Sequence, residues 1–305
     1  MGAVALRART LSPSGFRRIA GASVIALFVV VTSGAFVRLT GSGLGCDNWP
    51  RCGDKPYPER GYHAFVEFGN RMVALVGIVL ALVTWIAARR VEALSATGKW
   101  SALAAVLGGL AQIPLGAITI ALDLHPLAVM AHFLLGLTVL GLAVVAFLEG
   151  WLLVDGHARP PGPLWIRRLT SWVGVPICAA LVVTGAVATA SGPHPGADED
   201  VKRLGIAITD TVYVHVRVAA VFGIGVLFVG WFLLRLRRSY PGVFGLWAGL
   251  VAVLAAQAVV GEVQYRNALP WGLVLVHVFL AAAIWVLTLA VAYVLWRTPA
   301  SLARQ

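Results

Sequence analysis

The chain has 305 residues, of which 59% are hydrophobic and only 12% are charged. Soluble globular proteins carry about 25% charged residues, so this composition, with a mean hydropathy of +0.86, excludes that class and indicates a membrane protein. The formal net charge is +11, but the placement of the basic residues along the chain favours a membrane topology over a nucleic-acid partner.

Eight apolar runs are each long enough to cross a bilayer, which takes about 20 mostly apolar residues. In chain order they are residues 19–37, 63–88, 101–122, 126–148, 169–190, 211–234, 243–261 and 271–296. The sequence therefore predicts an all-α polytopic membrane protein with eight transmembrane helices.

Charges in the connecting segments predict the orientation of these helices. The side that holds both termini carries 15 Lys and Arg against three Asp and Glu, whereas the opposite side carries seven against nine. Short cytoplasmic loops collect basic residues. We therefore expect a multi-pass protein of the cell membrane with both termini in the cytoplasm, where the basic surplus faces lipid headgroups, and we expect no nucleic-acid partner.

An internal repeat relates the two halves of the chain. Four positions recur at an offset of 145 residues: Asn70 with His215, Gln112 with Gln257, Gly116 with Gly261, and His132 with His277. The first and fifth spans match more loosely. The repeat predicts two pseudo-symmetric four-helix bundles, residues 1–150 and 151–305, in parallel orientation and joined by a proline-containing linker.

Three histidines and one asparagine occupy equivalent depths in the even-numbered spans. Asn70, His132, His215 and His277 each lie about 10 Å below the outer membrane face at 1.5 Å per residue. The even-numbered spans all run through the membrane in the same direction. Asn70 can therefore face His132 in the first half, and His215 can face His277 in the second. This geometry suits a heme with axial imidazoles; the alternative for a single intramembrane histidine is a hydrogen bond to a neighbouring helix. We expect His215 and His277 to be heme ligands.

Glu67 is the only acidic residue well inside a span. At spacing i, i+3 it shares a helix face with Asn70, and a carboxylate at that depth is costly unless it is paired or protonated. Two interpretations stay open, namely a proton acceptor or charge stabiliser in a functional pocket, and a structural salt bridge to Arg71. Arg71 is itself either a partner for heme propionates or a helix-to-helix contact.

The connection between the first two spans carries Cys46 and Cys52, six residues apart. On the oxidising side of the membrane they can close a small disulfide ring. Such a ring either staples the loop or is a redox-active pair that exchanges electrons with a partner.

These motifs together resemble the heme A synthase family of the cytochrome oxidase assembly pathway. The resemblance is carried by Thr-Gly-Ser-Gly-Leu-Gly-Cys at 40–46, Trp49-Pro50, Cys52, Glu67-Phe68 before Arg71, and one histidine in each of the fourth, sixth and eighth spans. It covers nearly the whole chain, and the loop motif is its specific part.

The resemblance implies an oxidoreductase with two heme sites. His215 and His277 would ligate the iron of a b-type heme cofactor in the second half. The first half would take heme O as substrate and oxidise a ring methyl to a formyl group through hydroxylated intermediates, yielding heme A. Glu67 would correspond to the catalytic carboxylate and His132 to a ligand of the substrate iron, with Cys46 and Cys52 as the loop pair.

One departure from the family pattern concerns the substrate site. The family has histidine immediately before the arginine of the second span, where this chain has Asn70 before Arg71. Asparagine is a poor iron ligand, so the substrate heme is either five-coordinate or water-bound, or Asn70 acts only through hydrogen bonds. A bis-histidine site favours electron transfer, whereas an open coordination position favours chemistry.

Two other functions are compatible with the same residues. A b-type membrane cytochrome would pass electrons to or from quinone, and a heme-delivery scaffold would bind heme O without converting it. The expected partners are heme O, the heme O synthase that makes it (a membrane farnesyltransferase), and a quinone or another electron acceptor. The sequence leaves open a homo-oligomer.

Overall fold

The computed structural model describes residues 11–46, 48–197 and 201–304. Six charged residues used in the orientation argument lie outside these ranges: Arg7, Arg9, Asp47, Asp198, Glu199 and Asp200. The helices are α1 (Pro13–Leu39), α2 (Tyr62–Arg89), α3 (Ala96–Ala121), α4 (Pro126–Asp155), α5 (Leu164–Leu169), the π-helix η1 (Thr170–Gly174), α6 (Val175–Ser191), α7 (Ile208–Leu236), α8 (Pro241–Arg266), α9 (Trp271–Trp296) and the 3₁₀ turn η2 (Ala300–Leu302).

Eight membrane-spanning helices are present in the described part of the chain, which confirms the predicted all-α polytopic fold. The fifth span runs from Leu164 to Ser191 through α5, η1 and α6, and so begins five residues before the predicted run. Its π-turn precedes Pro176, which has no N–H to continue a regular α-helical ladder. The protein is therefore a multi-pass membrane protein.

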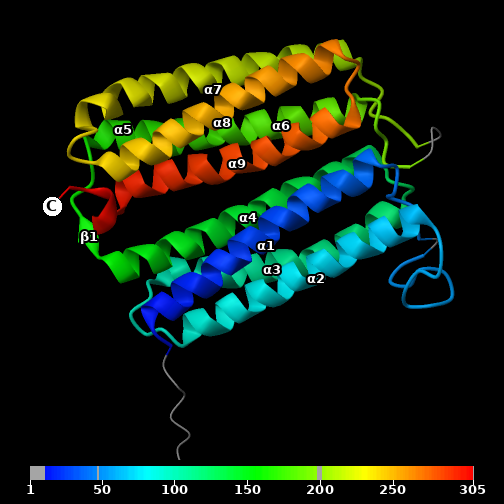
Figure 1. Ribbon diagram of the computed structural model, residues 1–305, viewed down its shortest axis with the longest axis horizontal. Helices are drawn as coiled ribbons and strands as arrows, with labels where there is room; N and C mark the ends of the chain where they lie inside the picture. The colour runs from blue at the N-terminus through cyan, green and yellow to red at the C-terminus, as the bar shows by residue number, and fades with distance from the viewer. Residues whose placement is uncertain (1–10, 47, 198–200, 305) are drawn as a thin grey trace, which may run out of the picture.

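The spans pack in two groups of four (Figure 1). Helix α1 contacts α2 and α4, and α3 contacts α2 and α4, while α6, α7, α8 and α9 pack in the same cyclic order. The groups meet where α9 lies against α1 and α4. There the Trp285 indole N–H donates to the Leu137 carbonyl at 2.9 Å, and the rings of Phe28 and Phe279 meet edge to face with centres 5.0 Å apart.

Short contacts tie the two groups together at both ends. At the end that holds the C-terminus (Figure 1), strand β1 (His157–Ala158) pairs antiparallel with β2 (Thr298–Pro299). Glu149 on α4 forms an ion pair there with Arg297. At the opposite end the Arg38 guanidinium of α1 donates to the carbonyls of His194 (2.9 Å) and Thr189 (3.1 Å).

Candidate functional site

A cavity of about 620 Å³ near the end opposite the C-terminus is lined mainly by the first four helices and the loop between α1 and α2, while residues of α6, α9 and the segment after α6 complete its wall. Four residues singled out from the sequence line it, namely Glu67, Asn70 and Arg71 from α2 and His132 from α4. The structure therefore brings the predicted first-half residues to one hollow. Most of the remaining wall is apolar, although the polar side chains of Arg38, Gln112, Thr119 and Thr189 also line it.

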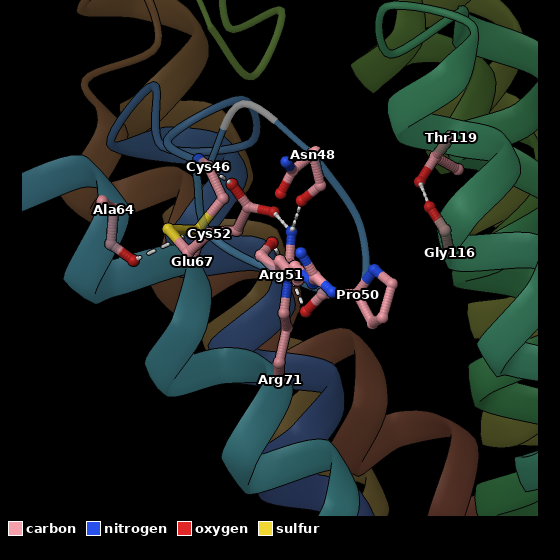
Figure 2. A network of polar contacts seen from close by, with 10 residues as sticks. All are labelled: Cys46, Asn48, Pro50, Arg51, Cys52, Ala64, Glu67, Arg71, Gly116 and Thr119. Atoms are coloured by element: carbon pink, nitrogen blue, oxygen red, sulfur yellow. Dashed lines mark hydrogen bonds and ion pairs between the residues drawn. A yellow bond between two sulfur atoms is a disulfide. The ribbon is translucent and has the colours of Figure 1, made fainter. Parts of the chain in front are cut away.

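Glu67 is buried, with 5% of its surface exposed, and both of its oxygens have partners (Figure 2). Its Oε2 accepts the Cys46 backbone N–H at 2.8 Å, and its Oε1 pairs with the Arg71 guanidinium. The pairing with Arg71 matches the structural interpretation of Glu67, although the carboxylate also lines the cavity. A carboxylate offers about four lone-pair sites, so these two contacts leave acceptor capacity toward the cavity.

Arg71 connects Glu67 to the loop above it (Figure 2). Its guanidinium donates to the carbonyls of Pro50 (3.2 Å), Arg51 (3.0 Å) and Asn48 (3.4 Å). A planar guanidinium carries five N–H donors. The two terminal nitrogens of Arg71 donate to the Glu67 carboxylate and to the loop carbonyls. Arg71 thus holds the loop over the cavity in the structure.

Cys46 and Cys52 form the predicted disulfide within this loop. The ring closes the segment whose carbonyls receive Arg71, and Trp49 and Pro50 of the same segment line the cavity. The third cysteine, Cys178, is buried in α6 and unbonded to another sulfur. The loop therefore forms the outer cover of the first-half cavity.

Asn70 and His132 form the next layer of the cavity. The Asn70 Oδ1 accepts a hydrogen bond from the Ser33 hydroxyl of α1 at 2.7 Å. The His132 carbonyl accepts the Gln112 side-chain N–H at 3.0 Å, while the His132 Nδ1 has no hydrogen-bond partner among the described residues. Asn70 is thus engaged with a neighbouring helix, and the imidazole of His132 is not.

His215 on α7 and His277 on α9 face each other in the second group of helices. Their ring centres are 6.3 Å apart, with an interplanar angle of 61°. Two metal–imidazole bonds of about 2 Å each, plus roughly 1 Å from each nitrogen to its ring centre, add to about 6 Å. The spacing therefore fits one metal ion between the two rings.

A glycine lies against each of the three histidine rings. A Cβ built on Gly185 would lie 3.0 Å from the Cε1 of His215, one on Gly261 would lie 3.2 Å from the Cε1 of His277, and one on Gly116 would lie 3.5 Å from the Cε1 of His132. The sequence repeat pairs Gly116 with Gly261, but it did not show that each of the three glycines makes room for an imidazole.

Three further polar residues were not predicted from the sequence: Ser33, Arg38 and Thr184. The Thr184 hydroxyl donates to a carbonyl one turn earlier in α6 and lies 3.2 Å from the His215 Nδ1. Its place in the repeat corresponds to Ser33, which bonds Asn70. Arg38, which also lines the cavity, is one of the seven basic residues that the sequence places on the side opposite the termini. The loose match of the first and fifth spans was the available indication for Ser33 and Thr184.

The family model of the cytochrome oxidase assembly protein matches residues 17–61 and 56–289, far more than half of the chain. The chain belongs to this family. The family match spans both histidine sites and the disulfide loop, so the residues described above lie within the shared region.

Individual relatives are similar at modest identity. A heme A synthase of Bacillus pumilus is 31% identical over 134 residues, 41% of this chain and 42% of that protein. This chain thus spans less than half the length of that relative. A heme A synthase of Shewanella oneidensis is 22% identical over 329 residues, 92% of this chain and 97% of that protein. A protoheme IX farnesyltransferase of Thermus thermophilus is 26% identical over 279 residues, 85% of this chain but 45% of that protein.

Proposed function

We propose that the protein is a heme A synthase, an oxidoreductase that oxidises a ring methyl of heme O to a formyl group through hydroxylated intermediates. Family membership and the names of the Bacillus and Shewanella relatives support this function. The observation that carries the proposal is that one membrane-embedded cavity is lined by both an imidazole, His132, and a carboxylate, Glu67.

In this proposal His132 ligates the substrate iron and Asn70 does not. The side-chain Oδ1 of Asn70 already accepts a hydrogen bond from the Ser33 hydroxyl, which supports a hydrogen-bonding role for the Asn70 side chain. His132 then remains as the strong axial donor of the first half, and a coordination position stays open beside Glu67. Arg71, which is fixed to the loop carbonyls, positions Glu67 and the loop above the substrate.

Glu67 holds negative charge at a fixed point of the cavity wall. The Cys46 N–H and Arg71 keep its carboxylate in place, so no reorganisation is needed when charge develops on the substrate. Its remaining lone pairs accept the proton released from the ring substituent as that carbon is oxidised. Trp49 and Pro50 line the outer end of the same cavity.

His215 and His277 are proposed to hold a b-type heme as cofactor. The 6.3 Å between their ring centres fits one iron with two axial imidazoles, and Gly185 and Gly261 leave room for both rings. When bound, such a heme supplies one-electron transfer. Among the described residues no group of three His, Cys, Asp or Glu side chains is placed to hold a metal ion.

The remaining parts of the proposal concern organisation and partners. Residues 1–150 form the substrate half and residues 151–305 the cofactor half, in a cell membrane with both termini cytoplasmic. Heme O comes from a membrane farnesyltransferase; the Thermus farnesyltransferase, which contains a segment similar to 85% of this chain, supports their proximity. A quinone or another acceptor takes the electrons. The protein forms a homo-oligomer.

Pigment analysis tests the function. The wild type and two variants, Glu67→Gln and Glu149→Gln, are expressed in a strain that makes heme O, and the extracted hemes are separated by reversed-phase chromatography. Glu149 is a matched control because it is a buried carboxylate, 2% exposed, that also pairs with an arginine but lies away from the cavity. We expect a heme A peak from the wild type and from Glu149→Gln, per amount of folded protein, and none from Glu67→Gln.

Each other outcome has a definite meaning. Normal heme A from Glu67→Gln would remove the catalytic role of Glu67. A wild type that binds heme but makes no heme A would overturn the proposed activity. Altered heme reduction would then indicate a b-type cytochrome, and retained heme O a delivery scaffold.

A further inference from the structure

The first-half cavity opens sideways between α2 and α3. Leu75 on α2 and Ile113 on α3 line the cavity, yet they are 52% and 39% exposed. Met72, one turn from Leu75, lines the cavity and is exposed as well. A side chain that both lines a cavity and faces the surroundings lies at its mouth, so these three residues define the α2–α3 mouth.

The neighbouring seams of the same bundle are closed. A Cβ on Gly77 of α2 would lie 3.0 Å from Val30 of α1, and one on Gly108 of α3 would lie 2.6 Å from Val139 of α4. These contacts with valine side chains close the two seams at that depth. Nearer the loop, no cavity-lining residue of α1 or α4 is exposed, in contrast to Met72, Leu75 and Ile113. Farther from the loop, Gly109 and Ile78 approach to ordinary contact, 3.4 Å for a built Cβ, and close the α2–α3 mouth at its inner edge.

The α2–α3 mouth faces the hydrocarbon region of the membrane. Leu75 is 13 residues from the start of α2 at Tyr62 and Ile113 is eight residues from the end of α3 at Ala121, about 20 Å and 12 Å along the helices at 1.5 Å per residue. The hydrocarbon core is about 30 Å thick. An apolar group that passes through the mouth therefore enters lipid and not water.

The cavity is polar at one end and apolar at the other. Glu67, Asn70 and Arg71 occupy its outer part, whereas the side chains at the mouth are Met72, Leu75 and Ile113. A ligand that fits this gradient has a polar or metal-containing body and a long apolar substituent. Heme O is such a ligand, because a farnesyltransferase adds an isoprenoid chain to protoheme, as the name of the Thermus relative indicates.

We propose that the α2–α3 mouth is the subsite for the isoprenoid chain of heme O, and that the substrate enters through it laterally from the bilayer. This inference rests on the proposed function. Lipid is as apolar as the mouth, so the subsite acts by leaving room for the chain and not through a hydrophobic driving force. A bulky side chain at the mouth should then exclude the chain sterically.

Tryptophan substitution tests the subsite with matched controls. Leu75→Trp and Ile113→Trp fill the mouth, while Val76→Trp and Leu110→Trp place the same side chain at positions 55% and 47% exposed on the same helices. Neither control residue lines the cavity. The purified holoproteins in lipid nanodiscs are assayed for kcat/KM with heme O and for binding of protoheme, which has no isoprenoid chain.

We expect the mouth variants to lower kcat/KM for heme O by about tenfold or more, which corresponds to about 1.4 kcal/mol or more. The controls should stay within about twofold of the wild type, and protoheme binding should be unchanged in all four. Mouth variants that behave like their controls would overturn the subsite, as would an equal loss for heme O and protoheme. A wild type that binds heme O but forms no heme A would instead contradict the proposed function, and heme O binding to the variants would still report on the mouth.

Discussion

Gly185 provides a graded test of the second-half site, because three glycines lie against three histidines at different distances. A Cβ on Gly185 would stand 3.0 Å from the His215 ring, which is 0.4 Å inside the 3.4 Å where ordinary contact begins. The corresponding overlap is 0.2 Å for Gly261 against His277, and there is none for Gly116 at 3.5 Å. Metal–ligand distances tolerate about 0.2 Å.

Gly185→Ala should therefore displace His215 beyond the tolerance of an axial bond. We expect this variant to lose most of its low-spin heme, Gly261→Ala to lose part of it, and Gly116→Ala to retain it. Alanine stabilises a helix by about 1 kcal/mol relative to glycine, so a loss of heme in Gly185→Ala cannot be attributed to a weaker helix.

Heme content per protein and the reduced visible spectrum measure this series. Purified wild type should show the bands of a six-coordinate low-spin heme, and the bands should weaken in the order Gly116→Ala, Gly261→Ala, Gly185→Ala. A Gly185→Ala protein with full low-spin heme, or a Gly116→Ala protein with the greatest loss, would refute the placement of the heme iron between His215 and His277.

Three other predictions concern the supports of the two sites. Thr184→Val removes the hydroxyl beside the His215 Nδ1. Because this hydrogen-bond partner makes the imidazole a more basic iron ligand, we expect Thr184→Val to raise the heme midpoint potential in a redox titration and Thr184→Ser to keep the wild-type potential. Arg71→Ala leaves the Glu67 carboxylate without its cation and should lower the unfolding free energy by about 3 kcal/mol, seen in thermal melts; an unchanged melt would contradict the burial of the pair. Replacing Cys46 and Cys52 with alanine should lower the free energy of unfolding by about 2 kcal/mol, because the unfolded chain gains loop entropy. Heme A formation should persist if the disulfide only staples the loop. Lost activity in a folded protein would favour the redox-active alternative.

The helices were predictable because their physical determinants are local in the chain. An apolar run of sufficient length needs no tertiary information, and the second, sixth and eighth spans begin and end within three residues of the predicted runs, whereas each of the other five extends five to seven residues beyond its run at one end. At the start of the fifth span the extension includes Arg167 and Arg168, which interrupt the apolar pattern. In the structure the Arg167 guanidinium donates to the carbonyls of Pro160 and Gly162, so this charged group has hydrogen-bond partners at the start of the span.

The site was predictable where helix geometry fixes it and unpredictable where a loop does. His215 and His277 meet because equal depth on two helices of the same direction brings their rings together. The loop carbonyls that bind Arg71 follow from a chain path that no periodicity encodes. The sequence therefore left the two roles of Glu67 open, and the structure shows that the ion pair and the cavity position coexist.

Helix α9 belongs to both sites at once. Val274 and Val278 line the first-half cavity, while His277, about 60° around the helix from Val274 and about 100° from Val278, faces His215. An α-helix with its side chains is about 10–12 Å across. In the proposed function, an electron that leaves the substrate has only this thickness of protein to cross before it reaches the second porphyrin, with no diffusing carrier in between.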